Sequence, residues 1–154
     1  MTASDIITAL IAVYGAVLST IILVREWKAK RPDIRVEVSL ASHQYPSGEL
    51  SNLKLIVFAT NAGEKAVVLS SPGLILPNQN RMWFPETDPE FDVTFPHQLR
   101  PEHPCSAWVD PGEVGRALKS DGFSGKVKLI GFYKDAVGRT HKSKPFKFDT
   151  DVYA

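Results

Sequence analysis

The sequence predicts a mainly β protein, in which a single N-terminal transmembrane helix precedes an antiparallel β-sandwich with one short helix between late strands. Three observations lead to this prediction. Residues 6–24 contain no charged side chain. Short apolar segments, separated by turn-forming residues, follow through the rest of the chain. One capped helical pattern occurs late. We therefore divide the chain into an anchor segment, 1–31, with a basic cytoplasmic flank, and a β-sandwich domain, 32–154.

The apolar run at 6–24 has the length of a membrane span. As a helix it extends about 28 Å, close to the thickness of the hydrocarbon core of a bilayer. No lysine or arginine precedes it, whereas Arg25, Lys28, Lys30 and Arg31 follow it. A cleaved signal peptide has the opposite charge order and a shorter apolar run, so an anchor is favoured. A buried helix of a soluble protein would need more surrounding chain than is present.

The flanking charges predict the orientation of the span. Cytoplasmic flanks are enriched in lysine and arginine, so the N-terminus is placed outside and the C-terminal domain in the cytoplasm. Trp27 follows the run at the position of an interfacial aromatic residue. Cys105 is the only cysteine, which excludes an intramolecular disulfide and agrees with a reducing compartment. We expect a single-pass protein of a bacterial inner (plasma) membrane whose first partner is the lipid bilayer.

Small side chains gather on one face of the predicted span. They are Ala12, Gly15, Ala16 and Ser19, in two small-xxx-small pairs that permit close helix packing in lipid. This face predicts helix association, either as a homo-oligomer or with a partner helix. The alternative is that such residues are simply common in membrane helices.

The domain after the anchor consists mainly of predicted strands. Ile34–Leu40 alternates apolar and polar residues, which indicates a half-buried strand. Leu53–Thr60 is apolar on both faces, as a central strand would be. Pro72-Gly73 is expected to break the chain between two further strands. The remaining predicted strands are 66–69, 74–76, 81–84, 91–95 and 105–109, with 85–104 otherwise irregular.

A helix and a hairpin complete the predicted domain. Asp110 is the expected N-cap, followed by Pro111 in the first turn and by Glu113 in a capping box, and Gly122 ends the helix. Segments 127–134 and 140–148 form a hairpin around the turn 135–138. About seven short strands favour an immunoglobulin-like arrangement, although the cysteine pair typical of antibody domains is absent.

Several turn motifs stand out along the domain. They are Asn61-Ala62-Gly63, the segment 95–101, the helix end Gly122-Phe123-Ser124-Gly125 and the segment 135–139. These motifs resemble those of a group of uncharacterised bacterial proteins with one N-terminal membrane helix and an immunoglobulin-like β-sandwich domain. Because they form turns and carry no chemical groups of a site, the resemblance implies a fold but no activity.

The sequence contains no recognisable catalytic, cofactor or metal motif. His97, His103 and Cys105 offer three ligands at spacings that zinc sites do not use. The alternating acids of 86–92 lack the glycine that a calcium loop needs at its tight turn. Nucleophile elbows and phosphate-binding loops are absent. We therefore expect no cofactor and no enzymatic activity.

Charge is segregated within the domain although the whole chain has a formal net charge of +1. A basic surface hairpin is predicted near the C-terminus. The candidate targets of this hairpin are anionic lipid, an acidic protein partner and the acidic segment of a second copy of the chain. The alternative interpretation is that its lysines prevent a sheet edge from pairing with another chain. The sequence argues against a nucleic-acid partner, because the hairpin has few aromatic side chains on which bases could stack. The basic residues are Lys126, Lys128, Lys134, Arg139, Lys142, Lys144 and Lys147.

These features favour a membrane-anchored, non-enzymatic binding or scaffold module that presents a β-sandwich to a protein partner of unknown identity. One alternative is a small oligomerising membrane effector or channel accessory protein. Another is a ligand-binding or hydrolytic domain that uses the 97–105 loop.

Overall fold

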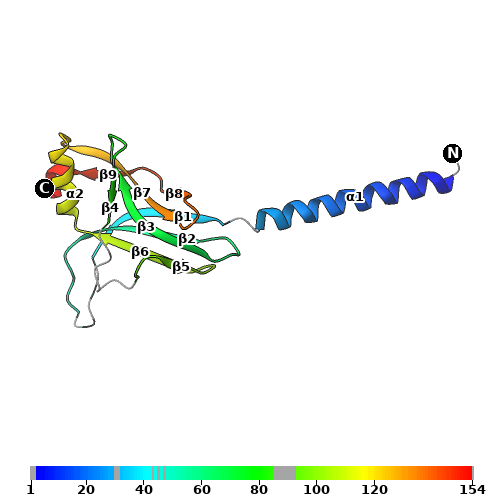
Figure 1. The fold of residues 1–154 in the computed structure, drawn as a ribbon, viewed down its shortest axis with the longest axis horizontal. Coiled ribbons are helices and arrows are strands. Elements are labelled where there is room, and N and C mark those ends of the chain that lie inside the picture. Colours follow the sequence, from blue (N-terminus) through cyan, green and yellow to red (C-terminus); the bar gives the residue numbers. More distant parts are fainter. Residues whose placement is uncertain are drawn as a thin grey trace.

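The structure, a computed structural model, is mainly β, with two antiparallel sheets and one long N-terminal helix. It describes residues 3–29, 32–42, 44, 46, 48–84 and 93–153. Figure 1 shows the long helix, α1, projecting from one end of the sheets, with α2 and the C-terminus at the opposite end. The predicted acidic segment 86–92 and part of the predicted strand 91–95 lie outside the described residues, as do Lys30 and Arg31.

Helix α1 (Ala3–Ala29) contains the predicted span and extends beyond it at both ends. Its segment Ser4–Trp27 has a mean hydropathy of 2.4 in its most apolar window, none of which is buried. Length and composition suit either a membrane anchor or a signal sequence. The chain thus has one apolar helix near its N-terminus that is long enough to cross a bilayer.

The first sheet has three antiparallel strands in the order β1-β2-β6. The alternation predicted for β1 is confirmed, because Ile34 and Val36 are buried whereas Arg35 and Glu37 are exposed. The central position predicted for the second strand is also confirmed, since residues 55–57 are all buried. The strands are β1 (Ile34–Ala41), β2 (Lys54–Asn61) and β6 (Pro104–Val109).

The second sheet has six strands built around β3 and β7. Its main order is β4-β3-β7-β8, while β5 pairs with β3 and β9 pairs with β7. The late hairpin was predicted as two strands, but its second half is divided into β8 and β9. The strands are β3 (Val67–Ile75), β4 (Arg81–Trp83), β5 (His97–Leu99), β7 (Lys126–Asp135), β8 (Thr140–Lys142) and β9 (Phe146–Asp149).

Two strand predictions were wrong in this sheet. The expected break at Pro72-Gly73 does not occur, because β3 continues through both residues opposite β7. A register shift between Leu69 and Ser71 accommodates the proline, and bulges are where strands tolerate proline. The region 85–104 was expected to be irregular from Pro96 onward, yet β5 forms there by pairing with β3.

Helix α2 (Pro111–Ser120) lies between β6 and β7, as predicted. The Asp110 carboxylate accepts a hydrogen bond from the Gly112 backbone at 2.8 Å, so the N-cap is confirmed with Gly112 rather than Glu113 as its donor. Gly122 has a φ of +85°, the left-handed conformation expected of a glycine that ends a helix. A short C-terminal helix, α3 (Thr150–Tyr153), was not predicted.

The two sheets share one hydrophobic core and approach closely where β7 crosses β2. The buried Tyr133 hydroxyl of β7 donates a hydrogen bond to the Val57 carbonyl of β2 at 2.7 Å. Two residues earlier, a Cβ added to Gly131 would collide with Val38 and lie 2.8 Å from Val57 Cγ1. Among the described residues no backbone pairing joins β1 to β8, so the sheets do not close into a barrel.

Two buried polar side chains fix the turns at the end of the sheets nearest α1. The Asn61 amide donates to the carbonyls of Lys65 and Leu99 at 2.7 and 3.1 Å. The Asp135 carboxylate accepts from the Val137 and Arg139 backbones at 3.1 and 2.8 Å. Both turns were predicted from the sequence, and these hydrogen bonds explain why each polar side chain is tolerated in the interior.

We expect Gly131→Ala to lower the free energy of unfolding by about 1–3 kcal/mol, because the added methyl group overpacks the contact between the sheets. Chemical denaturation of the full chain in detergent measures this change. Lys128→Ala, on the exposed side of the same strand, is the control and should change stability by less than about 0.5 kcal/mol. Equal losses in both variants would contradict the close approach.

Candidate interaction surface

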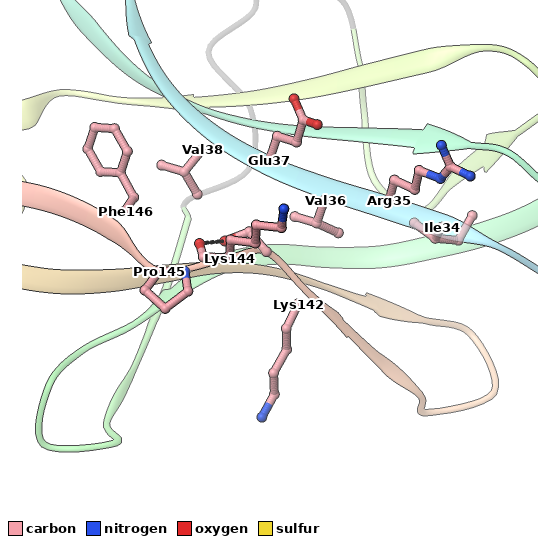
Figure 2. A pocket seen from close by; sticks show the side chains of 10 residues that line it. Ile34, Arg35, Val36, Glu37, Val38, Lys142, Lys144, Pro145 and Phe146 are labelled. Carbon is pink, nitrogen blue, oxygen red and sulfur yellow. Dashed lines mark hydrogen bonds between the residues drawn. The ribbon is translucent and has the colours of Figure 1, made fainter.

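A groove of about 560 Å³ lies between the edge strand β1 and the segment that joins β8 to β9. Figure 2 shows Ile34, Val36 and Val38 on the wall formed by β1, with Pro145 and Phe146 on the opposite wall. The Lys144 side chain points toward β1, whereas Lys142 points away from it. The groove is thus a slot between two sheet edges, with apolar side chains on both walls and the charged residues Arg35, Glu37 and Lys144 also in its lining.

The division between β8 and β9 produces one wall of this groove. The Ser143 backbone donates to the Gly131 carbonyl at 2.8 Å, and the Ser143 hydroxyl accepts from the Gly131 backbone at 2.9 Å. The Ser143 hydroxyl therefore accepts the hydrogen bond that a backbone carbonyl would accept in a regular antiparallel pair. Pro145 has no N–H to donate, so regular pairing resumes only at Phe146. The sequence showed the serine and proline, but their effect depends on the pairing register.

Five of the seven predicted basic residues share the outer face of the second sheet. Lys126, Lys128 and Lys134 alternate along β7 with residues that point into the core. Lys147 lies directly opposite Lys128, and residues paired in this way point to the same side of a sheet. Lys142 points to the same side, because it lies opposite Phe132, which shares the outer side of β7 with Lys128 and Lys134.

The structure places the other two basic residues elsewhere. Lys144 borders the groove, and Arg139 lies in the turn before β8. All seven are exposed except Lys134, which is half-buried. The predicted hairpin is therefore a lysine face of five residues with two basic neighbours, rather than one uniform surface.

An aromatic cluster that the sequence did not predict lies beside the lysine face. The rings of Trp83 and Phe132 meet edge to face, with 4.9 Å between centroids, and the Arg81 guanidinium lies 5.4 Å from the Phe132 centroid. Phe132 packs over Gly73, where a Cβ would come within 2.8 Å of the ring. Trp83 remains 45% exposed. Recognising this cluster required the pairing register of β4 with β3 and of β3 with β7, which is distant from both in sequence.

The lysine face is not neutralised by the part of the chain that the structure describes. None of its five residues forms an ion pair there, and Asp149 is the one acidic residue paired opposite any of them. Lys128 and Lys147, directly opposite each other, repel. A surface of this kind attracts an anionic partner and loses that attraction as salt is added.

All four small residues of the predicted helix-association face are exposed on α1. They are Ala12, Gly15, Ala16 and Ser19. A Cβ added at Gly15 would meet nothing within 4 Å. Neighbouring Thr20 directs its hydroxyl to the Ala16 carbonyl of its own helix at 2.8 Å. The face is accessible, and association through it stays a prediction.

The three residues of the 97–105 loop do not converge on one site. His97 belongs to β5, and the exposed His103 places Nδ1 2.9 Å from the Pro101 carbonyl. Cys105 is buried in β6. Within the described ranges no group of three or more histidine, cysteine, aspartate or glutamate side chains is arranged to hold a metal ion.

Cys105 lies in the core beside Tyr133. Burial raises the pKa of the Cys105 thiol to about 11, although hydrogen bonds with the Tyr133 side chain and the Ala59 backbone lower it in part. Burial, with the neighbouring Cys105 as a further cause, also raises the pKa of Tyr133 above its usual range. Since the thiolate is the nucleophilic form, this cysteine is chemically inert at neutral pH. Cys105 and Tyr133 therefore contribute to the packing of the core.

No protein-family model matches the chain, and no curated protein matches it either. Among solved structures, it is similar to a Bordetella pertussis protein provisionally called ApaA, with 14% identity and a TM-score of 0.37 over 78% of this chain and 95% of that one. It is also similar to the Northeast Structural Genomics Consortium target SoR45, with 16% identity and a TM-score of 0.32 over 75% and 86%. Similarity at this level assigns neither a fold nor a function.

Alkylation of Cys105 should be slow in the folded protein at every pH between 7 and 9, because a pKa of about 11 leaves no more than about 1% of the thiol ionised even at pH 9. Intact-mass measurement of iodoacetamide labelling follows the reaction. The same chain in denaturant is the control, and its labelling should be much faster than that of the folded chain at both pH 7 and pH 9. A labelling rate in the folded chain equal to that in denaturant would contradict the burial of Cys105.

Tyr133→Phe should lower the free energy of unfolding by about 1–3 kcal/mol, because it removes the buried hydrogen bond to the Val57 carbonyl. Tyr153→Phe is the matched control: its ring stacks on Phe148 at 5.2 Å, and no described residue hydrogen-bonds with its hydroxyl. Denaturant unfolding of both variants provides the comparison. A loss at Tyr153 equal to that at Tyr133 would contradict the role of the inter-sheet bond.

Proposed function

We propose that this chain is a membrane-anchored, non-enzymatic binding or scaffold module. In this proposal α1 spans a bacterial inner membrane once, and the basic flank that begins at Arg25 places the sheets on the cytoplasmic side. The support for the anchor is a 24-residue apolar segment with none of its most apolar window buried. Tethering raises the effective concentration of the domain at the membrane, so a weak interface can be sufficient.

The domain is proposed to be an immunoglobulin-like sandwich. Strand order supports this. If β1, β2, β3, β6, β7 and the β8–β9 pair correspond to strands A, B, C, E, F and G, then A, B and E share one sheet and C, F and G share the other. That division is the one found in immunoglobulin-like domains.

The lysine face carries the binding proposal. Five lysines point outward from adjacent strands without an ion pair among the described residues, beside the half-exposed Trp83. Interfaces favour aromatic residues at their centre, and complementary charge speeds association. An acidic segment of a protein partner fits this combination.

The adjoining groove adds an apolar contact to the same partner. Val36 and Val38 line it on one side and Phe146 on the other, with Lys144 at its border. An extended segment that alternates acidic and apolar side chains satisfies both surfaces, because successive residues of a strand point in opposite directions.

Helix pairing through the small face of α1 is a second proposal, for the anchor alone. Ala12, Gly15, Ala16 and Ser19 are exposed on one side of the helix, which leaves room for close approach of another helix. Cysteine crosslinking along α1 tests it, and a lack of periodicity in the crosslinks would count against it.

The charge-reversal variant Lys128→Glu/Lys147→Glu should weaken binding of an acidic partner at least about tenfold, because two attractive contacts become repulsive. The probe is a fluorescent peptide of alternating glutamate and valine, titrated by anisotropy against the full chain in nanodiscs of neutral lipid.

The control variant is Arg100→Glu/Arg116→Glu, which makes the same change in net charge at exposed positions away from the lysine face. It should retain nearly all of the affinity. Equal weakening by both variants would show that only net charge matters, and absence of binding by the unaltered chain would refute the acidic-partner proposal.

A further inference from the structure

A small apolar hollow of about 290 Å³ lies at the end of the sheets where the chain arrives from α1. Its lining includes Pro32, Lys65, Val67, Val68, Ala136 and Val137. These residues come from the start of the domain, from the beginning of β3 and from the turn after β7. Three segments distant in sequence therefore build one surface beside the linker.

Chain length holds this surface close to the end of α1. Pro32 is three residues beyond Ala29, the last residue of the helix, and three extended residues span at most about 11 Å. Trp27, near that end, has the side chain that is enriched at membrane–water interfaces. If α1 spans a bilayer, the hollow cannot lie far from its surface, whatever path the linker takes.

The hollow is bordered by valine side chains that the rest of the domain leaves in solvent. Val137 is 78% exposed at the tip of its turn, and Val68 is 39% exposed. The turn is held in place, because Asp135 accepts two of its backbone hydrogen bonds and the Ala136 backbone donates to the Val68 carbonyl at 2.8 Å. These hydrogen bonds hold Val68 and Val137 in fixed positions at the surface.

Basic residues flank these valines. Lys65 lines the hollow, and the exposed Arg139 follows the Val137 turn. Asp135 also lines the hollow, but its carboxylate is buried and hydrogen-bonded within the turn. Apolar side chains surrounded by lysine and arginine are typical of surfaces that enter the headgroup region of anionic membranes. A protein partner would have to be recruited, whereas lipid is present wherever the anchor is inserted.

We propose that this end of the domain docks on the bilayer that α1 spans, with Val68 and Val137 in the interfacial region. The inference rests on the proposed membrane anchor. Docking sets the orientation of the domain, because β3 runs from Val67 at the membrane to Ile75 about 26 Å away. The turn at Asn78 and helix α2 then face the cell interior (Figure 1).

The test uses the full chain in nanodiscs that contain anionic lipid. Cys105→Ala removes the native thiol, and single cysteines replace Val137, Leu18 or Asn78 in turn. Each carries an environment-sensitive fluorophore, and brominated lipids quench those that reach the bilayer. The label at 137 should lose more than about half of its intensity, as the label within α1 at 18 does, while the label at 78 should be nearly unaffected.

A second pair of variants tests the apolar contact itself. Val68→Asp should reduce quenching at 137 at least about threefold. Val152→Asp is the matched control, because Val152 is 67% exposed on α3, at the end of the domain away from α1 (Figure 1). It should leave quenching unchanged.

The outcomes separate docking from anchoring. Quenching at 18 with no more quenching at 137 than at 78 would overturn docking and leave the anchor intact. Absence of quenching at 18 would overturn the anchor and the docking proposal together. Equal effects of Val68→Asp and Val152→Asp would refute the role assigned to the valines.

Discussion

The contact between β7 and the first sheet governs the rest of the domain. Gly131 permits the strands to approach because no side chain separates it from Val38 and Val57. Tyr133 then spans the remaining distance and hydrogen-bonds with the Val57 carbonyl. A larger residue at Gly131 would force the sheets apart and lengthen that bond. The two sheets are therefore joined at this point by close packing and by the hydroxyl of the buried Tyr133.

The candidate surfaces follow from the same strand. Because Tyr133 and Leu129 point inward, the lysines at alternate positions of β7 must point outward. Because the Ser143 hydroxyl accepts the hydrogen bond from the Gly131 backbone, the strand beside β7 is interrupted between β8 and β9, and the interruption forms one wall of the groove. The lysine face and the groove are thus two results of how β7 is paired, and they adjoin each other.

Local patterns in the sequence predicted part of this fold. The alternation from Ile34 indicated β1, and Asp110 with Gly122 indicated both ends of α2, because caps and strand period depend on neighbouring residues. The continuity of β3 through Pro72 was missed, since it depends on a register shift against β7. The basic residues were recognised as a group, but assigning each of them to the lysine face, the groove or the turn required the pairing register of β7 with β8 and β9. The contact of Trp83 with Phe132 joins β4 to β7 and has no local sequence pattern.

The buried position of Cys105 has a consequence for how any assembly of this protein would behave. A chain whose single thiol is enclosed and protonated forms neither mixed disulfides with glutathione nor covalent dimers while it is folded. A native dimer of the folded chain is consequently not held by a disulfide. A dimer band that disappears when reductant is added would instead report molecules that had unfolded and exposed their sulfur.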